Sequence, residues 1–177
     1  HGEMQTCPVC KSNIKKIKVA ELAHIFKLET KFSKAFDVNY LDKQGKQNLV
    51  YMGCYGIGVS RILGILAEKF ADDKGLSFPN SVAPFSVHLV PLYTKDSKIN
   101  KKIQDQILKI YDKLVKSNIP VLYDNRDVSS SIKLVESDLI GIPYRIVISE
   151  KTLENNSFEF KERNKKTAKK IPLKNFN

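Results

Sequence analysis

The chain has 177 residues, of which 30 are Lys or Arg and 19 are Asp or Glu, so its formal net charge is +11. Hydrophobic residues make up 42% of it and charged residues 28%, which is typical of a globular protein and excludes wholesale disorder. Its apolar runs are far shorter than the roughly 18 residues of a membrane span, and residues 1–4 lack the pattern of a signal peptide. Since the sequence starts at His1 and not at Met, we expect it to be the C-terminal part of a longer protein.

The basic charge and the three cysteines indicate a kind of partner and a compartment. The charge favours a polyanionic partner, because Lys and Arg neutralise phosphates and release counterions, although a lysine-rich soluble surface gives the same sum. Three cysteines are too few for a disulfide framework, which indicates a reducing compartment. Cys7 and Cys10 form half of a zinc knuckle, but tetrahedral zinc needs four ligands. The other candidate ligands are Cys54, His1, His24 and His88. With no second CxxC pair, we predict no metal site.

The first part of the chain mixes short strands, polar turns and one helix. Residues 23–28 alternate between apolar and longer polar side chains, which predicts a half-buried strand. Residues 42–46 are a turn signal, and residues 49–52 predict a strand that enters a glycine-rich turn. Beyond it, apolar side chains recur at helical spacing, which predicts an amphipathic helix over 59–72.

After a proline-containing linker, strands and helices alternate. We expect strands at 87–92, 119–123, 144–148 and 158–161, and helices around 99–114 and 131–140. Strands separated by helices predict βαβ units and a mostly parallel sheet covered by helices. The regular alternation of residues 158–161 is typical of an exposed edge strand. The basic stretch 161–174 predicts a frayed or nucleic-acid-facing tail.

The most informative string is residues 53–61, which read Gly-Cys-Tyr-Gly-Ile-Gly-Val-Ser-Arg. It lacks the Gly-Lys-Ser/Thr of a P-loop, and Arg61 stands where a dinucleotide fingerprint has its third glycine. Glycines let a ligand approach the backbone, and an arginine on the first turn of a helix suits a phosphate. The alternative is a plain connection between strand and helix, with packing glycines and a surface arginine.

This string resembles motif 3 of the class II aminoacyl-tRNA synthetases, and in this form that of the bacterial prolyl-tRNA synthetase family. Four further strings resemble the same family in the same order. They are the proline-pocket strand (24–28 with 30–33), the entry into the anticodon-binding domain (81–85 with 87–89), the second strand of that domain (121–126), and its following helix exit and strand (138–143 with 145–147). The chain is identified as a member of this family.

The resemblance implies a fold and a reaction. Residues 1–78 would be the end of a class II antiparallel-sheet catalytic core (α+β), and residues 79–84 a linker. Residues 85–177 would be an α/β anticodon-binding domain with a mostly parallel mixed sheet. The implied reaction is the ATP-dependent attachment of proline to tRNA(Pro) through prolyl-adenylate, with Mg²⁺, in a cytoplasmic homodimer that needs no membrane.

The resemblance also implies roles for residues near motif 3. Arg61 would be the catalytic residue that contacts the ATP phosphates, and the backbone at Gly56 and Gly58 would leave room for the adenylate. The proline pocket would be lined by His24, Phe26 and Cys54. Without the resemblance, His24 is an ordinary strand histidine and Phe26 a core residue. The sequence departs from the family at Ala23 and Glu29, where the family has glycines.

In the anticodon-binding domain, the resemblance implies contacts with tRNA. The matching residues are Asp124, Arg126 and Lys133. Asp and Arg side chains are suited to the base edges of guanines in an unpaired anticodon. The alternative is an ion-paired surface loop. The sequence also departs from the family at residues 128–131, which lack its Glu-Arg pair and glycine.

Two other interpretations stay open. No Phe-Arg-x-Glu string of motif 2 occurs, and motif 1 is absent, so we expect the chain by itself to be inactive. One alternative is therefore a stand-alone tRNA-binding module or an inactive paralogue. The other is a small-ligand α/β protein that uses residues 56–61 as an anion site.

Overall fold

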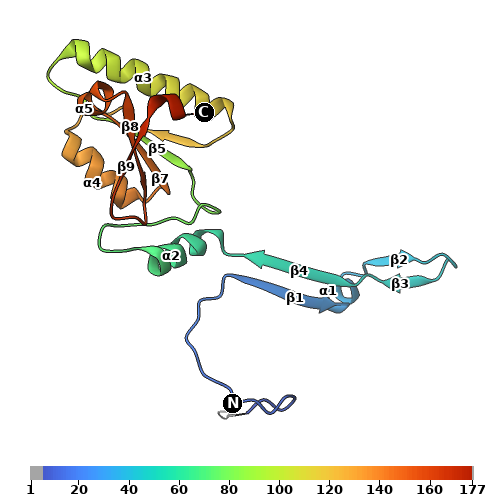
Figure 1. The fold of residues 1–177 in the computed structure, drawn as a ribbon. Coiled ribbons are helices and arrows are strands. Elements are labelled where there is room, and N and C mark those ends of the chain that lie inside the picture. The colour runs from blue at the N-terminus through green and yellow to red at the C-terminus, as the bar shows by residue number, and fades with distance from the viewer. Residues whose placement is uncertain (1–5, 177) are drawn as a thin grey trace. The chain divides into compact units, whose positions relative to one another are not determined.

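The computed structural model describes residues 6–176, in which helices and strands follow one another along the chain (Figure 1). The chain divides into two compact units, residues 1–65 and residues 66–177. Helix α2 (Val59–Phe70) contains the boundary between them. Among residues 6–176, no helix combines the length and the hydropathy that crossing a bilayer requires.

Two antiparallel strand pairs make up the first unit. Strand β1 (Ala23–Glu29) is followed by a short helix, α1 (Lys31–Ala35), and pairs with β4 (Met52–Ile57), while β2 (Asn39–Leu41) pairs with β3 (Gln47–Leu49). The predicted turn at 42–46 joins β2 to β3, and the Asp42 carboxylate stabilises it by accepting a hydrogen bond from the backbone N–H of Lys46. The strand predicted over 23–28 is confirmed, with one more residue at its end, but its side chains are mostly exposed and not half-buried as predicted.

The glycine-rich string forms a strand, and the predicted tight turn is wrong. Residues 52–57 lie extended in β4, and the chain passes at Gly58 directly into α2. Gly56 lies opposite His24 in the antiparallel register. Hydrogen bonding along β1 holds the string extended, which outweighs the preference of glycine for turns. The strand predicted over 49–52 is divided as well, between the end of β3 and the start of β4.

The first unit has almost no core of its own. Ser33 is the single buried residue among residues 6–65. The predicted helix α2 forms and ends at Phe70, but Leu63 of its apolar stripe is 55% exposed, and Tyr55 on β4 is 77% exposed. Because folded domains bury most such side chains, the apolar faces of this unit lack a packing partner within it.

The second unit contains a five-stranded mixed sheet. Its strands lie in the order β6 (Val121–Tyr123), β5 (Val87–Pro91), β7 (Tyr144–Ile148), β8 (Ser157–Glu162) and β9 (Lys169–Pro172). The pairings of β5 with β6 and β7 are parallel, and those of β8 with β7 and β9 are antiparallel. The helices are α3 (Ser97–Lys116), α4 (Ser130–Ile140) and α5 (Glu150–Glu154), with a 3₁₀ turn at Leu173–Asn175. The α/β class and the mixed sheet are thus confirmed.

Helix α3 supplies the core of this unit. Its buried side chains are Ile103, Ile107, Ile110 and Leu114, which pack against Val87, Leu89, Ile146 and Ile148 of the sheet. The helical stripe predicted from the sequence is therefore confirmed. Asp96 caps the helix, because its carboxylate accepts a hydrogen bond from the N–H of Lys98 at 2.8 Å. The packing of α3 on one face of the sheet fixes the positions of β5 and β7, which carry polar side chains on the opposite face.

The opposite face of the sheet carries buried polar side chains. Because side chains alternate along a strand, His88 of β5 and Arg145 of β7 point away from α3. The guanidinium of Arg145 donates to the Asp138 carboxylate on α4 at 3.0 Å. His88 is 2% exposed, and its Nδ1 atom has no hydrogen-bond partner among the described residues. Burial lowers the pKa of His88 to about 4, against the opposing effect of the Asp124 charge, while Arg145 and Arg126 lower it further.

The C-terminal stretch forms neither the edge strand nor the frayed tail predicted for it, and the nucleic-acid-facing alternative stays a prediction. Strand β8 is interior, because β9 pairs with its outer side, so the predicted edge strand is wrong. The basic stretch is folded and not a frayed tail: the Lys161 ammonium lies 3.1 Å from the Asp138 carboxylate, and the buried Arg163 guanidinium lies 2.6 Å from that of Asp72. Two of the charges assigned to a nucleic-acid-facing tail therefore form internal ion pairs.

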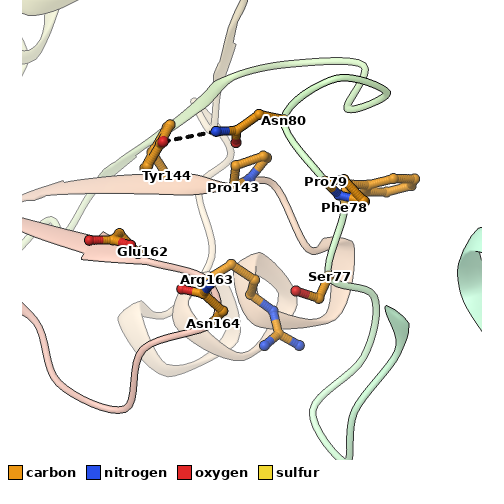
Figure 2. A pocket seen from close by; sticks show the side chains of 9 residues that line it. All are labelled: Ser77, Phe78, Pro79, Asn80, Pro143, Tyr144, Glu162, Arg163 and Asn164. Atoms are coloured by element: carbon orange, nitrogen blue, oxygen red, sulfur yellow. Dashed lines mark hydrogen bonds between the residues drawn. The ribbon is translucent and has the colours of Figure 1, made fainter. Parts of the chain in front are cut away.

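Residues 72–79, which we call the strap, lie against the C-terminal end of α4. The Leu76 N–H donates to the Leu139 carbonyl, and the Phe78 N–H donates to the Gly141 carbonyl, both at 3.0 Å. Figure 2 shows the chain from Ser77 to Asn80, where the Asn80 amide donates to the Tyr144 hydroxyl at 2.9 Å. The strap is thus an integral part of the second unit.

Gly141 ends α4 in the left-handed conformation, at φ 78°, and a Cβ there would lie 2.1 Å from the carbonyl oxygen of Leu76. We expect Gly141→Ala to destabilise the second unit by at least about 2 kcal/mol, from backbone strain and displacement of the strap. Urea unfolding of the chain, followed by circular dichroism, measures this. Gly45→Ala is the matched control, at φ 76° with no atom within 4 Å, and should leave unfolding of the second unit unchanged. Equal effects of the two substitutions would contradict the role of Gly141.

The buried neutral His88 predicts an acid-sensitive second unit. Its folded pKa of about 4 lies below the unfolded value of about 6.5, so the unfolded state takes up the proton first as the pH falls. Stability is therefore lost below pH 6.5, by about 2 kcal/mol between pH 7 and pH 5. Urea titrations at the two pH values should show that His88→Leu loses about 2 kcal/mol less than the wild type. The same pH dependence in both proteins would contradict this assignment.

Candidate functional site

The residues expected to hold proline lie together on one face of the β1–β4 pair. In the antiparallel register, Phe26 lies opposite Cys54 and His24 opposite Gly56. Residues that lie directly opposite each other project to the same face of a strand pair. The rings of His24 and Phe26 stack with centroids 3.8 Å apart and planes inclined by 5°. They form a flat aromatic surface beside Cys54.

The glycines of β4 leave this surface open. A Cβ at Gly56 would meet no atom within 4 Å, so the space above the strand beside His24 is vacant. His24 is itself exposed, and its Nδ1 lies 3.5 Å from the Glu21 carboxylate. A face with stacked rings, vacant space and a hydrogen-bonding imidazole can hold a small ligand with an apolar part.

Arg61 lies at the edge of the same unit, on the first turn of α2. One terminal N–H of its guanidinium donates to the Glu21 carbonyl, and this bond holds the arginine against the residues that precede β1. The Gly58 N–H donates to the Leu22 carbonyl at 2.8 Å, and a Cβ at Gly58 would lie 3.3 Å from that of Arg61. The guanidinium has four further N–H donors, in a fork that matches phosphate oxygens.

A second cluster, at the end of β6, contains the three residues expected to contact the anticodon. The Arg126 guanidinium donates to the Asp124 carboxylate from Nε at 2.9 Å and from Nη2 at 2.8 Å. It also donates to Glu136 of α4 at 2.6 Å. The Lys133 ammonium donates to the carbonyls of Asp124 at 3.1 Å and Pro91 at 3.2 Å. The structure therefore brings the three residues together.

Burial gives these three residues different accessibility. Lys133 is 1% exposed, and burial lowers the pKa of its ammonium, while the nearby Asp124 charge opposes that shift. Asp124 is buried as well, and its hydrogen bonds from Arg126 lower the pKa of its carboxyl. The Arg126 side chain is 47% exposed. Asp124 is ion-paired with Arg126 and Lys133 is hydrogen-bonded to two backbone carbonyls, so base contact by these residues stays a prediction.

A pocket of about 210 Å³ adjoins this network. It is lined by His88, Leu122, Tyr123, Asp124, Asn125, Arg126 and Ile140. Its apolar wall and charged rim suit a flat ring with polar edges. The sequence analysis considered His88 only as a zinc ligand. It missed Glu136, which orients Arg126 from α4. A histidine inside an otherwise apolar strand is the one signal that could have indicated the pocket.

Cys7 and Cys10, the two cysteines of the half zinc knuckle, lie in a tight turn near the start of the described residues. The Cys7 N–H donates to the Ser12 carbonyl at 2.8 Å, and the Lys11 N–H donates to the Cys7 carbonyl at 3.0 Å. Hydrogen bonding with the Ser12 side chain and backbone and with Cys7 lowers the pKa of the Cys10 thiol to about 7. Among residues 6–176, no group of three or more His, Cys, Asp or Glu side chains is arranged to hold a metal ion. His1 lies outside the described residues.

Comparison with known proteins identifies two domain families in the chain. Residues 86–177 match the family described as "Anticodon binding domain". Residues 12–70 match the family described as "tRNA synthetase class II core domain (G, H, P, S and T)". The first match alone covers more than half of the chain.

Curated relatives carry the name proline–tRNA ligase. That of Endomicrobium trichonymphae is 46% identical over 159 residues, which are 89% of this chain and 27% of that protein. That of Persephonella marina is 40% identical over 161 residues, 91% of this chain and 28% of that protein. This chain therefore spans little more than a quarter of the length of these relatives.

A solved structure agrees with these relatives. It is described as Giardia lamblia prolyl-tRNA synthetase in complex with prolyl-adenylate, and it matches with a TM-score of 0.74 and 26% identity. The match covers 88% of this chain and 32% of that one. The chain therefore belongs to the class II aminoacyl-tRNA synthetases, with part of the synthetase core domain followed by an anticodon-binding domain, and its relatives are proline–tRNA ligases.

Proposed function

We propose that this chain is part of a proline–tRNA ligase, a cytoplasmic homodimer that attaches proline to tRNA(Pro) through prolyl-adenylate. The observation that carries the proposal is the order of two sites on one chain. The open aromatic face on the β1–β4 pair, in the unit that carries Arg61, is followed by an anticodon-binding domain, and relatives that align with both parts of the chain carry the name proline–tRNA ligase. The boundaries expected from the sequence, with a linker at 79–84, belong to this proposal.

The first unit would carry the chemistry of activation. Proline attacks the α-phosphate of ATP, so the site must hold both substrates in line and neutralise phosphate charge. Arg61 supplies a fixed positive charge, while Gly56 and Gly58 keep side chains out of the adenylate site. His24, Phe26 and Cys54 would contact proline. Mg²⁺ would accompany ATP, and we assign it no step.

The second unit would bind the anticodon at the pocket beside Asp124 and Arg126. The exposed guanidinium of Arg126 can donate to a base edge, while Asp124 and Glu136 hold it in place. Lys133 would act beneath the surface, where its two bonds to carbonyls join the ends of β5 and β6. These residues thus form a preorganised edge for reading guanines.

The exposed apolar faces of the first unit argue against a stand-alone tRNA-binding module. A module that acts alone would leave Tyr55 and Leu63 in water, at 77% and 55% exposure. Surfaces of this kind are covered in stable proteins. In a complete class II core, further strands and helices are available to cover them.

Substitution of Arg61 tests the activation site. In the complete natural polypeptide, we expect Arg61→Ala to reduce proline-dependent ATP–pyrophosphate exchange at least about tenfold, the scale of one lost phosphate contact. Lys69→Ala, which removes the same charge from the last turn of α2, is the matched control and should leave exchange unchanged. If Arg61→Ala exchanges ATP and pyrophosphate at the wild-type rate, Arg61 does not contact the ATP phosphates. A wild type without any exchange would reject the proposed function.

Binding of tRNA by the 177-residue chain tests the second site. We expect filter binding to show affinity for tRNA(Pro) that falls at least about tenfold between about 50 and 200 mM salt. Arg126→Lys keeps the positive charge but lacks the paired N–H donors of the guanidinium. We expect it to bind wild-type tRNA(Pro) and tRNA(Pro) with substituted anticodon guanines with more similar affinities than the wild-type protein does. Lys166→Ala, on the exposed β8–β9 turn, should weaken binding to both RNAs alike. Discrimination that persists in Arg126→Lys would exclude Arg126 as a reader.

A further inference from the structure

Cys7 and Cys10 form a CxxC pair that the proposed function leaves without a role. Both are free cysteines, and Cys10 is exposed whereas Cys7 is half-buried. Pro8 and Val9 between them lie in a turn, and Val9 is 88% exposed. The pair therefore lies at a surface that small molecules in solution can reach.

Backbone hydrogen bonds fix the spacing of the two cysteines. The Lys11 N–H donates to the Cys7 carbonyl at 3.0 Å, which closes one turn around the pair, and the Cys7 N–H donates to the Ser12 carbonyl at 2.8 Å. A bridge between Thr6 and Asn13 continues this pairing. In a turn closed by a bond between residues four apart, Cα atoms three residues apart are separated by about 5 Å. A disulfide needs roughly 4.4–6.8 Å between Cα atoms, so this turn suits one.

The surroundings of Cys10 favour its thiolate. Its sulfur lies 3.3 Å from the Ser12 hydroxyl oxygen, and that hydroxyl can donate to the thiolate. Hydrogen bonds with Ser12 and with Cys7 lower the pKa of the Cys10 thiol to about 7, so about half of it is ionised at neutral pH. The adjoining sequence is basic as well, because residues 6–20 contain four lysines and no acidic residue. Cys10 is thus the more nucleophilic member of the pair.

A disulfide between these two sulfurs needs no further residue, whereas tetrahedral zinc would need two ligands besides them. Thiol–disulfide exchange requires a thiolate that attacks and a second thiol close enough to complete the reaction. Cys10 meets the first requirement by its exposure and its hydrogen bonds. Cys7 meets the second, because the turn holds it beside Cys10.

We propose that Cys10 is a site of exchange with small-molecule disulfides and that Cys7 completes the exchange by closing a disulfide with it. This site is independent of the proposed function. In the first step, the Cys10 thiolate attacks one sulfur of the small disulfide, so that a mixed disulfide forms and one small thiolate leaves. In the second step, the Cys7 thiol loses its proton to water and its sulfur attacks that of Cys10, which releases the second small thiolate. The two cysteines are oxidised, and their two electrons reduce the small disulfide to two thiols.

The exchange is reversible, so the state of the pair follows its surroundings. In a reducing compartment, which the cysteine content indicates, small thiols keep Cys7 and Cys10 in the free form that the structure shows. The pair closes when small disulfides accumulate.

Reaction of the complete natural polypeptide with oxidised glutathione at neutral pH tests the proposal. Residues 1–10 contain no Lys or Arg, so trypsin leaves both cysteines in the peptide that ends at Lys11. We expect mass spectrometry to find this peptide lighter by two hydrogen atoms and without glutathione. Cys54 is the internal control: it is exposed, but β1 and β4 hold no other cysteine, so it should form a mixed disulfide at most.

Three variants separate the roles of the residues. Cys7→Ser should trap glutathione on Cys10, whereas in Cys10→Ser the less exposed Cys7 should react at least about threefold more slowly. Ser12→Ala should slow closure at least about twofold, because fewer Cys10 thiols are ionised and the higher nucleophilicity of each thiolate offsets only part of that loss. Ser117→Ala, which removes a hydroxyl from an exposed position at the end of α3, is the matched control and should close at the wild-type rate.

Three results would overturn the proposal. If the peptide that ends at Lys11 stays reduced while Cys54 takes up glutathione, the pair is not a site of exchange. If Cys7→Ser and Cys10→Ser take up glutathione at equal rates, Cys10 is not the attacking thiol. If the purified polypeptide contains zinc that is lost in both of these variants, the two cysteines are metal ligands instead.

Discussion

The burial of one isoleucine stripe supports most of the order in this protein. Ile103, Ile107 and Ile110 of α3 are buried on the parallel strands, and this packing fixes where each strand end lies. The polar face behind those strands can then hold a buried lysine and a buried histidine at defined positions. In the first unit, β1 and β4 are paired in register but lack a comparable buried core, so their candidate site depends mainly on backbone pairing and on the stacked rings of His24 and Phe26.

The buried charges are tolerated because each is matched by bonds that the core keeps in place. Lys133 donates to two carbonyls, and Arg163 to a carboxylate and a carbonyl. An ammonium or guanidinium without such partners would be expensive to bury. His88 is the exception, because it stays neutral and leaves Nδ1 unpaired among the described residues. The protein thus uses its polar interior to hold loops and strand ends, while the exposed Arg126 remains available to a ligand.

The sequence predicted those parts of the fold whose patterns are local. Helix α3 follows from apolar side chains at helical spacing, and β1 from alternation. The strand β4 could not be predicted, because pairing with a strand about 30 residues earlier overrides the turn preference of its glycines. The grouping of His24, Phe26 and Cys54 followed from family resemblance, whereas their shared face needed the register. Contacts between residues 91 apart, such as Arg163 with Asp72, leave no local signal.

The uneven distribution of buried side chains has a consequence for the order of folding. Residues 66–177 contain a complete core, whereas residues 6–65 bury only Ser33. During synthesis the ribosome releases the first unit before the second, and multidomain proteins usually fold in that order. In residues 6–177 we expect the opposite order of folding, because residues 66–177, which emerge last, are the ones that can form a core by themselves. The earlier segment keeps Tyr55 and Leu63 in water even after the later one has folded, so its apolar surface is a place in this stretch where aggregation can start.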